Sequence, residues 1–90
     1  MFKIIISKSF NKDVKLCIRR GCQMDKLWTV IEILAEKGSL PSRYKAHKLS
    51  GNYAGLWECH IAPDWLLIWK QDHEALTLLM TRTGTHSDLF

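Results

Sequence analysis

The chain has 90 residues, which is enough for one domain and leaves no room for a second hydrophobic core. Hydrophobic residues make up 47% of it and include four tryptophans, which argues against wholesale disorder. Thirteen Lys and Arg against nine Asp and Glu give a net charge of +4, which favours a polyanionic or acidic partner. We therefore expect one globular domain over residues 1–90.

The sequence carries no signal for export or for membrane insertion. No apolar run approaches the ~20 residues of a membrane span, and the run Phe2–Ile6 is too short for the core of a signal peptide. The three cysteines are odd in number and lack CxxC spacing, which is typical of reduced thiols in a cytosolic protein. These features predict a cytoplasmic protein that does not bind membranes.

The first half of the sequence predicts a strand and two helices. The run "MFKIIISK" is rich in β-forming residues, and Ser9 can cap a helix that ends near Gly21. A second helix can start at Asp25 and finish before Gly38, and two helices joined by so few residues should form an antiparallel hairpin. Their apolar residues recur at helical spacing: Phe10, Val14, Cys17 and Ile18 in the first, then Leu27, Val30, Ile31 and Leu34.

The second half predicts a long loop followed by a β-meander. Residues 39–52 contain four basic residues, a proline and a glycine, and ordered loops of this length are commonly functional. Three β-rich runs follow, separated by the turns "APD" and "QDHE": Leu56–Ile61, Trp65–Lys70 and Ala75–Arg82. The order β-α-α-β-β-β predicts an α+β fold in which the helical hairpin packs on one face of a mainly antiparallel, twisted sheet.

Strand alternation divides the run "LWECHI" into two faces. Trp57, Cys59 and Ile61 point one way, and we expect this apolar face to lie against the helices. Glu58 and His60 then share the open face, about 6.5–7 Å apart, which is enough to flank a small reacting group. Two polar residues on a solvated strand face do not by themselves indicate a function. Whether this face is a functional site therefore depends on the other groups near it.

Several acid–base groups are expected near this pair. Asp64 lies at the turn after the strand, Arg82 ends the last strand, and His86 follows four residues later. His47 lies in the basic loop that precedes the sheet, whereas His73, in a hairpin turn, is expected to be exposed and without a role. Histidine titrates near neutrality, so the set can transfer protons and stabilise an anion without a metal.

Other chemistries have less support in the sequence. It has no HxxxH motif, no CxxC pair and no carboxylate array suited to Zn²⁺ or Mg²⁺, so we expect neither a metal nor another cofactor. The end "GTHSDLF" contains no phosphate-cradling loop and no nucleophile elbow. Trp65 and Trp69 share a strand face, where core packing is the default, although Trp65 at an open strand end could stack a nucleobase.

Three motifs, "LPSRYKAHKLSG", "WECHIAPDWLLIW" and "RTGTHSDLF", carry a family resemblance. Through them the whole chain resembles the YafQ-like branch of the RelE/ParE toxin superfamily, the toxic halves of bacterial type II toxin–antitoxin pairs. The resemblance implies a RelE-like fold and a ribosome-dependent endoribonuclease that cuts mRNA without a metal, by attack of the ribose 2′-hydroxyl on the adjacent phosphate. It also implies mRNA, the ribosome and a cognate acidic antitoxin as partners. The toxin would be monomeric when free and part of a higher-order complex with the antitoxin.

The resemblance also assigns roles to residues of this sequence. We expect His86 to be the general acid, Arg82 to neutralise the phosphate and Asp64 to orient an imidazole or share in proton transfer. His47, His60 and Glu58 are the candidates for the general base or for the group that orients it, and the assignment of acid and base depends on distances. The full set implied by the family is catalytic His47, Glu58, His60, Asp64, Arg82 and His86, with Trp65 and Phe90 positioning the substrate.

The chain departs from the family pattern at two positions. Ala46 stands where the family commonly has Asp before the loop histidine, so one orienting partner of His47 is missing. Trp57 stands where the family often has a basic residue, and Lys45 or Lys48 could supply the lost phosphate contact. We expect weaker or differently selective cleavage.

Two other functions are compatible with the same fold. One is a non-catalytic inhibitor like the ParE-type toxins that poison DNA gyrase, which would not need an acid–base cluster. The other is a nucleic-acid or protein binding module whose histidines are incidental. Cleavage of ribosome-bound mRNA separates both from the enzyme.

Overall fold

The computed structural model describes residues 1–90 and contains one five-stranded sheet. The order of the strands is β1-β5-β4-β3-β2; β1 runs parallel to β5, and the other pairs are antiparallel. The N-terminal strand therefore adds to the far side of the meander, beside the last strand. The strands are β1 (Lys3–Ile6), β2 (His47–Lys48), β3 (Trp57–Ala62), β4 (Trp65–Asp72) and β5 (Thr77–Gly84).

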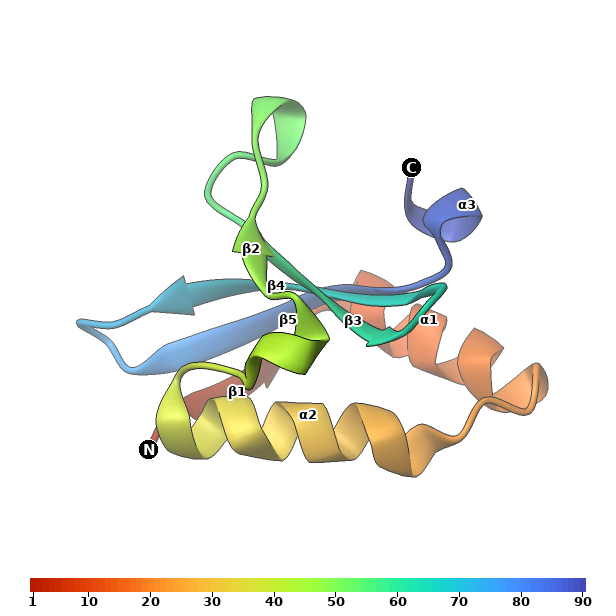
Figure 1. Ribbon diagram of the computed structural model, residues 1–90, viewed down its shortest axis with the longest axis horizontal. Helices are drawn as coiled ribbons and strands as arrows, with labels where there is room; N and C mark the ends of the chain where they lie inside the picture. Colours follow the sequence, from red (N-terminus) through yellow and green to blue (C-terminus); the bar gives the residue numbers. More distant parts are fainter.

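The α+β fold expected from the sequence is confirmed. Helices α1 (Lys8–Arg19) and α2 (Met24–Lys37) form a hairpin under one face of the sheet, as Figure 1 shows. On the opposite side lie β2, the 3₁₀ turn η2 (Gly51–Tyr53) and the short helix α3 (His86–Leu89). The predicted loop is thus ordered and contains β2, η2 and a second 3₁₀ turn, η1 (Ser42–Tyr44).

The start of α1 differs from the prediction, because Ser7 rather than Ser9 caps the helix. The Ser7 Oγ accepts a hydrogen bond from the Phe10 N–H at 3.0 Å and donates one to the Thr81 carbonyl at 2.8 Å. It can do both because Ser7 is still extended and lies beside β5, whereas Ser9 is exposed in the first helical turn. The same side chain therefore begins α1 and ties it to the edge of β5.

The main core lies between the helical hairpin and the sheet. The apolar residues that recur at helical spacing in both helices face this core, except for Ile18, which is 58% exposed. Two strand residues predicted to face the helices, Cys59 and Ile61, are buried there, and Trp57 packs against the same cluster. The core comprises Phe10, Val14, Cys17, Leu27, Val30, Ile31, Leu34, Cys59, Ile61, Trp65, Leu67, Trp69, Leu78 and Met80.

A second, smaller cluster covers the other face of β4. Leu66 and Ile68 are buried there beneath Leu89 of α3, and Leu49 and Leu56 of the loop pack against them. The face expected to be open is therefore partly roofed, because β4 has apolar residues on both sides and both must leave water. This roof sets the boundaries of the candidate site.

Two further properties of the whole chain bear on function. None of its helices is both long enough and apolar enough to cross a membrane. All three cysteines are unpaired, and Cys17 and Cys59 are buried. Burial raises the pKa of the Cys17 thiol to about 11 and that of Cys59 to about 12, so both stay protonated near neutral pH.

Replacement of Ser7 by alanine should destabilise the protein by about 1–3 kcal/mol, because it removes a helix cap and the link to β5. The matched change Ser9→Ala should leave the free energy of unfolding within about 0.5 kcal/mol of wild type. Urea unfolding at pH 7 measures both. Equal losses for the two variants would contradict the capping assignment.

Candidate active site

A row of side chains from four strands crosses the face opposite the α1–α2 hairpin. His47 of β2 is paired with Glu58 of β3, and Glu58 is in turn paired with Ile68 of β4. Ile68 is paired with Arg82 of β5. Cross-strand partners project on the same side of a sheet, so three of the predicted residues share this face.

His47 and Glu58 form the first acid–base pair of the site. His47 Nε2 lies 3.4 Å from Glu58 Oε1, and its Nδ1 lies 2.9 Å from the Lys45 carbonyl oxygen. A carbonyl can only accept, so Nδ1 carries a hydrogen and Nε2 is the nitrogen left for proton exchange. The partner that Ala46 cannot provide is thus supplied by the backbone of Lys45 and by Glu58.

Glu58 is only 6% exposed, which differs from the solvated position expected on an open strand face. Its cross-strand neighbours on this face are His47 and Ile68, and Ile68 is buried in the smaller cluster. A carboxylate in such a position is costly unless it is paired, and His47 is its ion-pair partner. The two side chains form an ion pair when Nε2 carries a proton.

Asp64 and His86 form the second pair. His86 Nδ1 lies 2.8 Å from Asp64 Oδ1, and the His86 backbone N–H donates to the same oxygen at 3.1 Å. The hydrogen bond from the His86 side chain is the main cause that lowers the pKa of Asp64, so this carboxyl is ionised near neutral pH. Nδ1 is held by the carboxylate, and Nε2 of His86 is free to exchange a proton.

His60 connects the two pairs. Its ring centroid lies 6.0 Å from that of His86, and it is two residues from Glu58 on the same strand. Residues at this spacing share a strand face. Five of the six predicted catalytic residues are thereby brought to one region: His47, Glu58, His60, Asp64 and His86.

Arg82 shares the face but is held by another residue. Its Nε and Nη2 donate to the two carboxylate oxygens of Asp13 in α1, at 2.7 and 3.1 Å, and Asp13 also accepts the Thr83 backbone N–H. The hydrogen bond to Asp13 is the main cause that raises the pKa of Arg82. Nη1 and the second hydrogen of Nη2 remain for a substrate, so Arg82 is a fixed, partly neutralised cation rather than a free one.

Trp65 does not lie where a nucleobase could stack on it. The side chain is 8% exposed within the main core, and its indole N–H donates to the Thr83 hydroxyl at 3.0 Å. That hydroxyl donates in turn to the Leu66 carbonyl at 2.6 Å. The geometry thus speaks against the predicted substrate contact, because the first residue of β4 faces the helices and not the open end of the strand.

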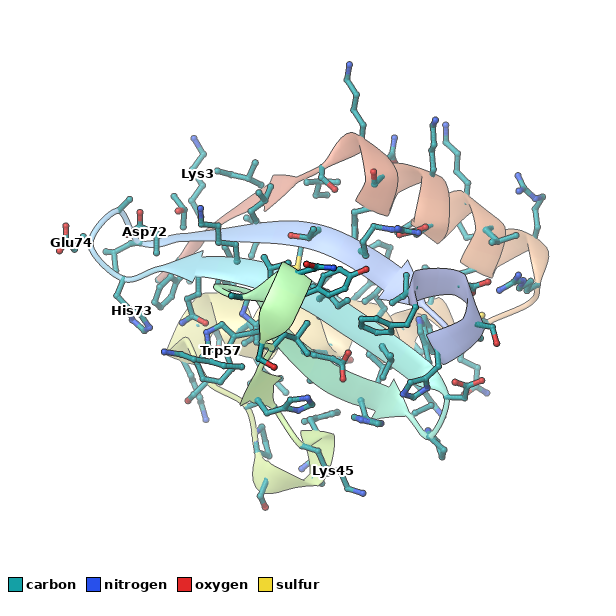
Figure 2. The ribbon with its side chains drawn as sticks, turned by 90° about the horizontal axis from the view of Figure 1, so that it is seen from above. Lys3, Lys45, Trp57, Asp72, His73 and Glu74 are labelled. Atoms are coloured by element: carbon teal, nitrogen blue, oxygen red, sulfur yellow. The ribbon has the colours of Figure 1, made fainter.

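Two other predicted substrate contacts lie at the margins. Phe90 is 56% exposed and meets Tyr53 edge to face at 5.1 Å, while its neighbour Leu89 is the buried anchor of α3. Lys48 follows His47 on β2 and so projects to the other face, with its Nζ 5.6 Å from the centre of the Trp57 ring. Trp57 lies on the half of the sheet nearer the β4–β5 hairpin (Figure 2).

The fourth histidine is remote from the site. Figure 2 shows His73 at the tip of the β4–β5 hairpin, at the end of the sheet away from α3. Its ring contacts Phe2 edge to face at 5.5 Å. No group of three His, Cys, Asp or Glu side chains anywhere in the chain is arranged to hold a metal ion.

One pair of residues that fixes the site has no signal in the sequence. Arg20, at the end of α1, donates from Nη1 to Asp88 Oδ2 at 2.7 Å and from Nη2 to Oδ1 at 3.2 Å. Asp88 also completes a capping box with Thr85. The Asp88 carboxylate accepts a hydrogen bond from the Thr85 backbone N–H, and the Asp88 backbone N–H donates one to the Thr85 hydroxyl. The pair thus clamps α3, and with it His86, to the α1–α2 hairpin.

Asp88→Asn should loosen α3 and lower cleavage of the substrate by about 10- to 100-fold, because His86 loses its fixed position. Arg20 lowers the pKa of Asp88, so this carboxylate stabilises the fold above about pH 4 and the contribution is lost as the pH falls through its depressed pKa. The urea midpoints of wild type and variant should therefore differ at pH 7, and the difference should narrow only as the pH falls below about 4 toward the depressed pKa of Asp88.

Asp72→Asn is the matched control for this change. Asp72 Oδ1 accepts the backbone N–H groups of Glu74 and Ala75 in the β4–β5 hairpin, so it has a comparable local role far from α3. It should leave cleavage unchanged. An equal loss of cleavage in both variants would show a general structural effect instead of a clamp on α3.

Comparisons with known proteins identify the family of this chain. The family described as "Bacterial toxin of type II toxin-antitoxin system, YafQ" matches residues 2–90. The mRNA interferase toxin YafQ of Escherichia coli (strain K12) is 40% identical over 85 residues, which cover 93% of this chain and 90% of that protein. The crystal structure of YafQ from E. coli strain BL21(DE3) has a TM-score of 0.92 at 37% identity, over 100% of this chain and 99% of that one.

A structure of a complex gives the same result. YafQ in the crystal structure of the E. coli DinJ–YafQ complex has a TM-score of 0.90 at 38% identity, over 100% of this chain and 99% of that one. The resemblance drawn from three motifs is thereby confirmed over almost the whole sequence. The chain belongs to the YafQ family, the bacterial toxins of type II toxin–antitoxin systems.

Proposed function

We propose that this toxin is an mRNA interferase, an endoribonuclease that cuts mRNA on the ribosome. The observation that carries the proposal is the Asp64–His86 pair beside His60, with the His47–Glu58 pair on the same face. Two oriented imidazoles with free Nε2 atoms are what an acid–base cleavage of RNA requires. The name and activity of the E. coli relative support the same function.

The reaction proceeds by attack of the ribose 2′-oxygen on the adjacent phosphorus. A base takes the proton of the 2′-hydroxyl, the new P–O2′ bond forms, and the bond from phosphorus to the 5′-oxygen breaks. The departing 5′-oxygen takes a proton from the acid, which leaves a 5′-hydroxyl and a 2′,3′-cyclic phosphate. Every proton has a side-chain donor or acceptor, and each such step contributes about 10²–10⁴-fold.

His86 is the acid in this proposal, and His47 is the favoured base. Asp64 holds Nδ1 of His86 and stabilises its imidazolium, so that Nε2–H can be given to the leaving oxygen. His47 takes the 2′-proton on Nε2, where the buried Glu58 compensates the new positive charge. His60 lies between the two and hydrogen-bonds the phosphate, together with the free Nη1 of Arg82.

The proposal includes an antitoxin as the regulating partner. The E. coli relative forms a complex with DinJ, and we expect an acidic protein to cover the same face in this +4 chain. Both the mRNA target and the antitoxin are consistent with a cytoplasmic location. A partner on this face would also add to the stability of a small domain through binding.

His86→Ala should reduce cleavage of translated message by about 10²–10⁴-fold, because the leaving oxygen then lacks its acid. The side chain is more than half exposed, so the urea midpoint should change little. Cut sites and their end groups, mapped in a purified translation system, measure the effect. His73→Ala removes an imidazole from the remote hairpin and should cleave like wild type.

Full cleavage by His86→Ala would refute the assignment of the acid. Cleavage by neither wild type nor control, with translation still blocked, would instead favour a non-catalytic inhibitor. A 5′-phosphate at the cut would exclude attack by the 2′-oxygen.

A further inference from the structure

A basic cavity of about 610 Å³ lies beside His60, outside the row of catalytic candidates. It is bounded by the N-terminal part of α2, by the η1 loop and by the end of β3 from His60 to Pro63. Pairing of β2 with β3 ends at His47 and Glu58, so no strand covers this part of the β3 edge. Its volume is in the range of ligand sites, ~300–1,000 Å³.

The charges around this cavity suit an anion. Lys26 of α2 and Arg43 and Lys45 of the η1 loop line it, with Asp25 as the only carboxylate. None of these three cations makes an ion pair, whereas the guanidinium groups of Arg20 and Arg82 are both bound to carboxylates. The cavity therefore holds three cations that are not tied up in ion pairs.

An aromatic surface lies among these cations. The Arg43 guanidinium carbon is 4.6 Å from the centre of the Tyr44 ring, and Arg43 Nη2 donates to the Tyr44 hydroxyl at 3.2 Å. Tyr44 itself is half-buried against the main core, which fixes the ring. A fixed ring with a guanidinium beside it is the kind of surface on which nucleobases stack.

Lys45 connects the cavity to the first acid–base pair. Its backbone is left-handed, with φ 54° and ψ 42°, a conformation that costs a non-glycine residue about 1–2 kcal/mol. In this conformation the carbonyl binds Nδ1 of His47 while the side chain lines the cavity. Figure 2 shows Lys45 extending from the η1 loop beyond the β3 edge of the sheet. Strain of this kind concentrates at functional sites.

We propose that this cavity is a nucleotide subsite that holds the RNA residue next to the cleaved linkage. Lys26, Arg43 and Lys45 bind the phosphate of that residue, and its base lies against Tyr44. The scissile phosphate is then at His60, which borders both the cavity and the catalytic face. This inference rests on the proposed ribonuclease function, and it makes the lysine and arginine side chains determinants of substrate binding rather than of the chemical step.

The double variant Lys26→Gln/Arg43→Gln tests the subsite. The probe is a single-stranded RNA oligonucleotide with 2′-O-methyl riboses, which lacks the attacking hydroxyl, and binding is followed by fluorescence anisotropy. Loss of two cationic contacts to this phosphate should weaken binding at least tenfold and reduce the salt slope by up to about 0.7. On translated message the variant should show a raised KM with little change in kcat.

Two matched variants control for net charge and for the backbone. Lys12→Gln/Lys15→Gln removes the same charge from exposed positions of α1 and should bind like wild type. Lys45→Asn removes the third cation but keeps a residue that tolerates the left-handed backbone. It should weaken RNA binding while the pH dependence of kcat stays as in wild type, because His47 keeps its carbonyl partner.

The outcomes separate this subsite from its rivals. Equal binding by the two double variants would overturn it. Selective loss of binding to an acidic antitoxin, with RNA binding intact, would also overturn it and assign the cavity to the antitoxin. If the wild type binds RNA but never cleaves message, and the cavity variant loses that binding, the ribonuclease function is refuted while the RNA subsite stands.

Discussion

The position of α3 is the constraint on which the site depends, because a helix of four residues cannot hold its own conformation in water. Contacts from outside the helix replace that missing stability. Leu89 is buried against β4, and the bidentate ion pair of Asp88 with Arg20 ties the helix to the hairpin on the other side of the sheet. Only with both in place do the backbone and the ring of His86 meet Asp64.

The small size of the protein explains why stability and activity share the same residues. A chain of this length buries only about 60–65% of its unfolded surface, so the sheet needs cover on both faces. The hairpin covers one face, and the loop around β2 together with α3 covers the other. These two covering segments also carry His47 and His86, so the second, smaller cluster packs the sheet and at the same time positions the acid–base groups.

Local patterns in the sequence predicted the helices, the meander and the face shared by Glu58 and His60, because periodicity depends only on neighbouring residues. They did not predict contacts between distant residues. Arg20 and Asp88 are 68 positions apart, and nothing near either one indicates the other. For Trp65, strand alternation gave core packing as the default and the family resemblance gave a substrate role. Whether a strand end is open depends on the segments that pack there, here the helices beneath β4.

Cys59 illustrates what separates the two faces of one strand. It lies between Glu58 and His60, yet its thiol points into the core, and desolvation by burial, with the nearby Glu58 charge, raises its pKa to about 12. The sulfur therefore remains a neutral thiol near neutral pH and offers no nucleophile on the face that carries Glu58 and His60. Alkylation of this cysteine needs the core to open, so its rate reports unfolding events, and a partner that binds only the folded protein slows it.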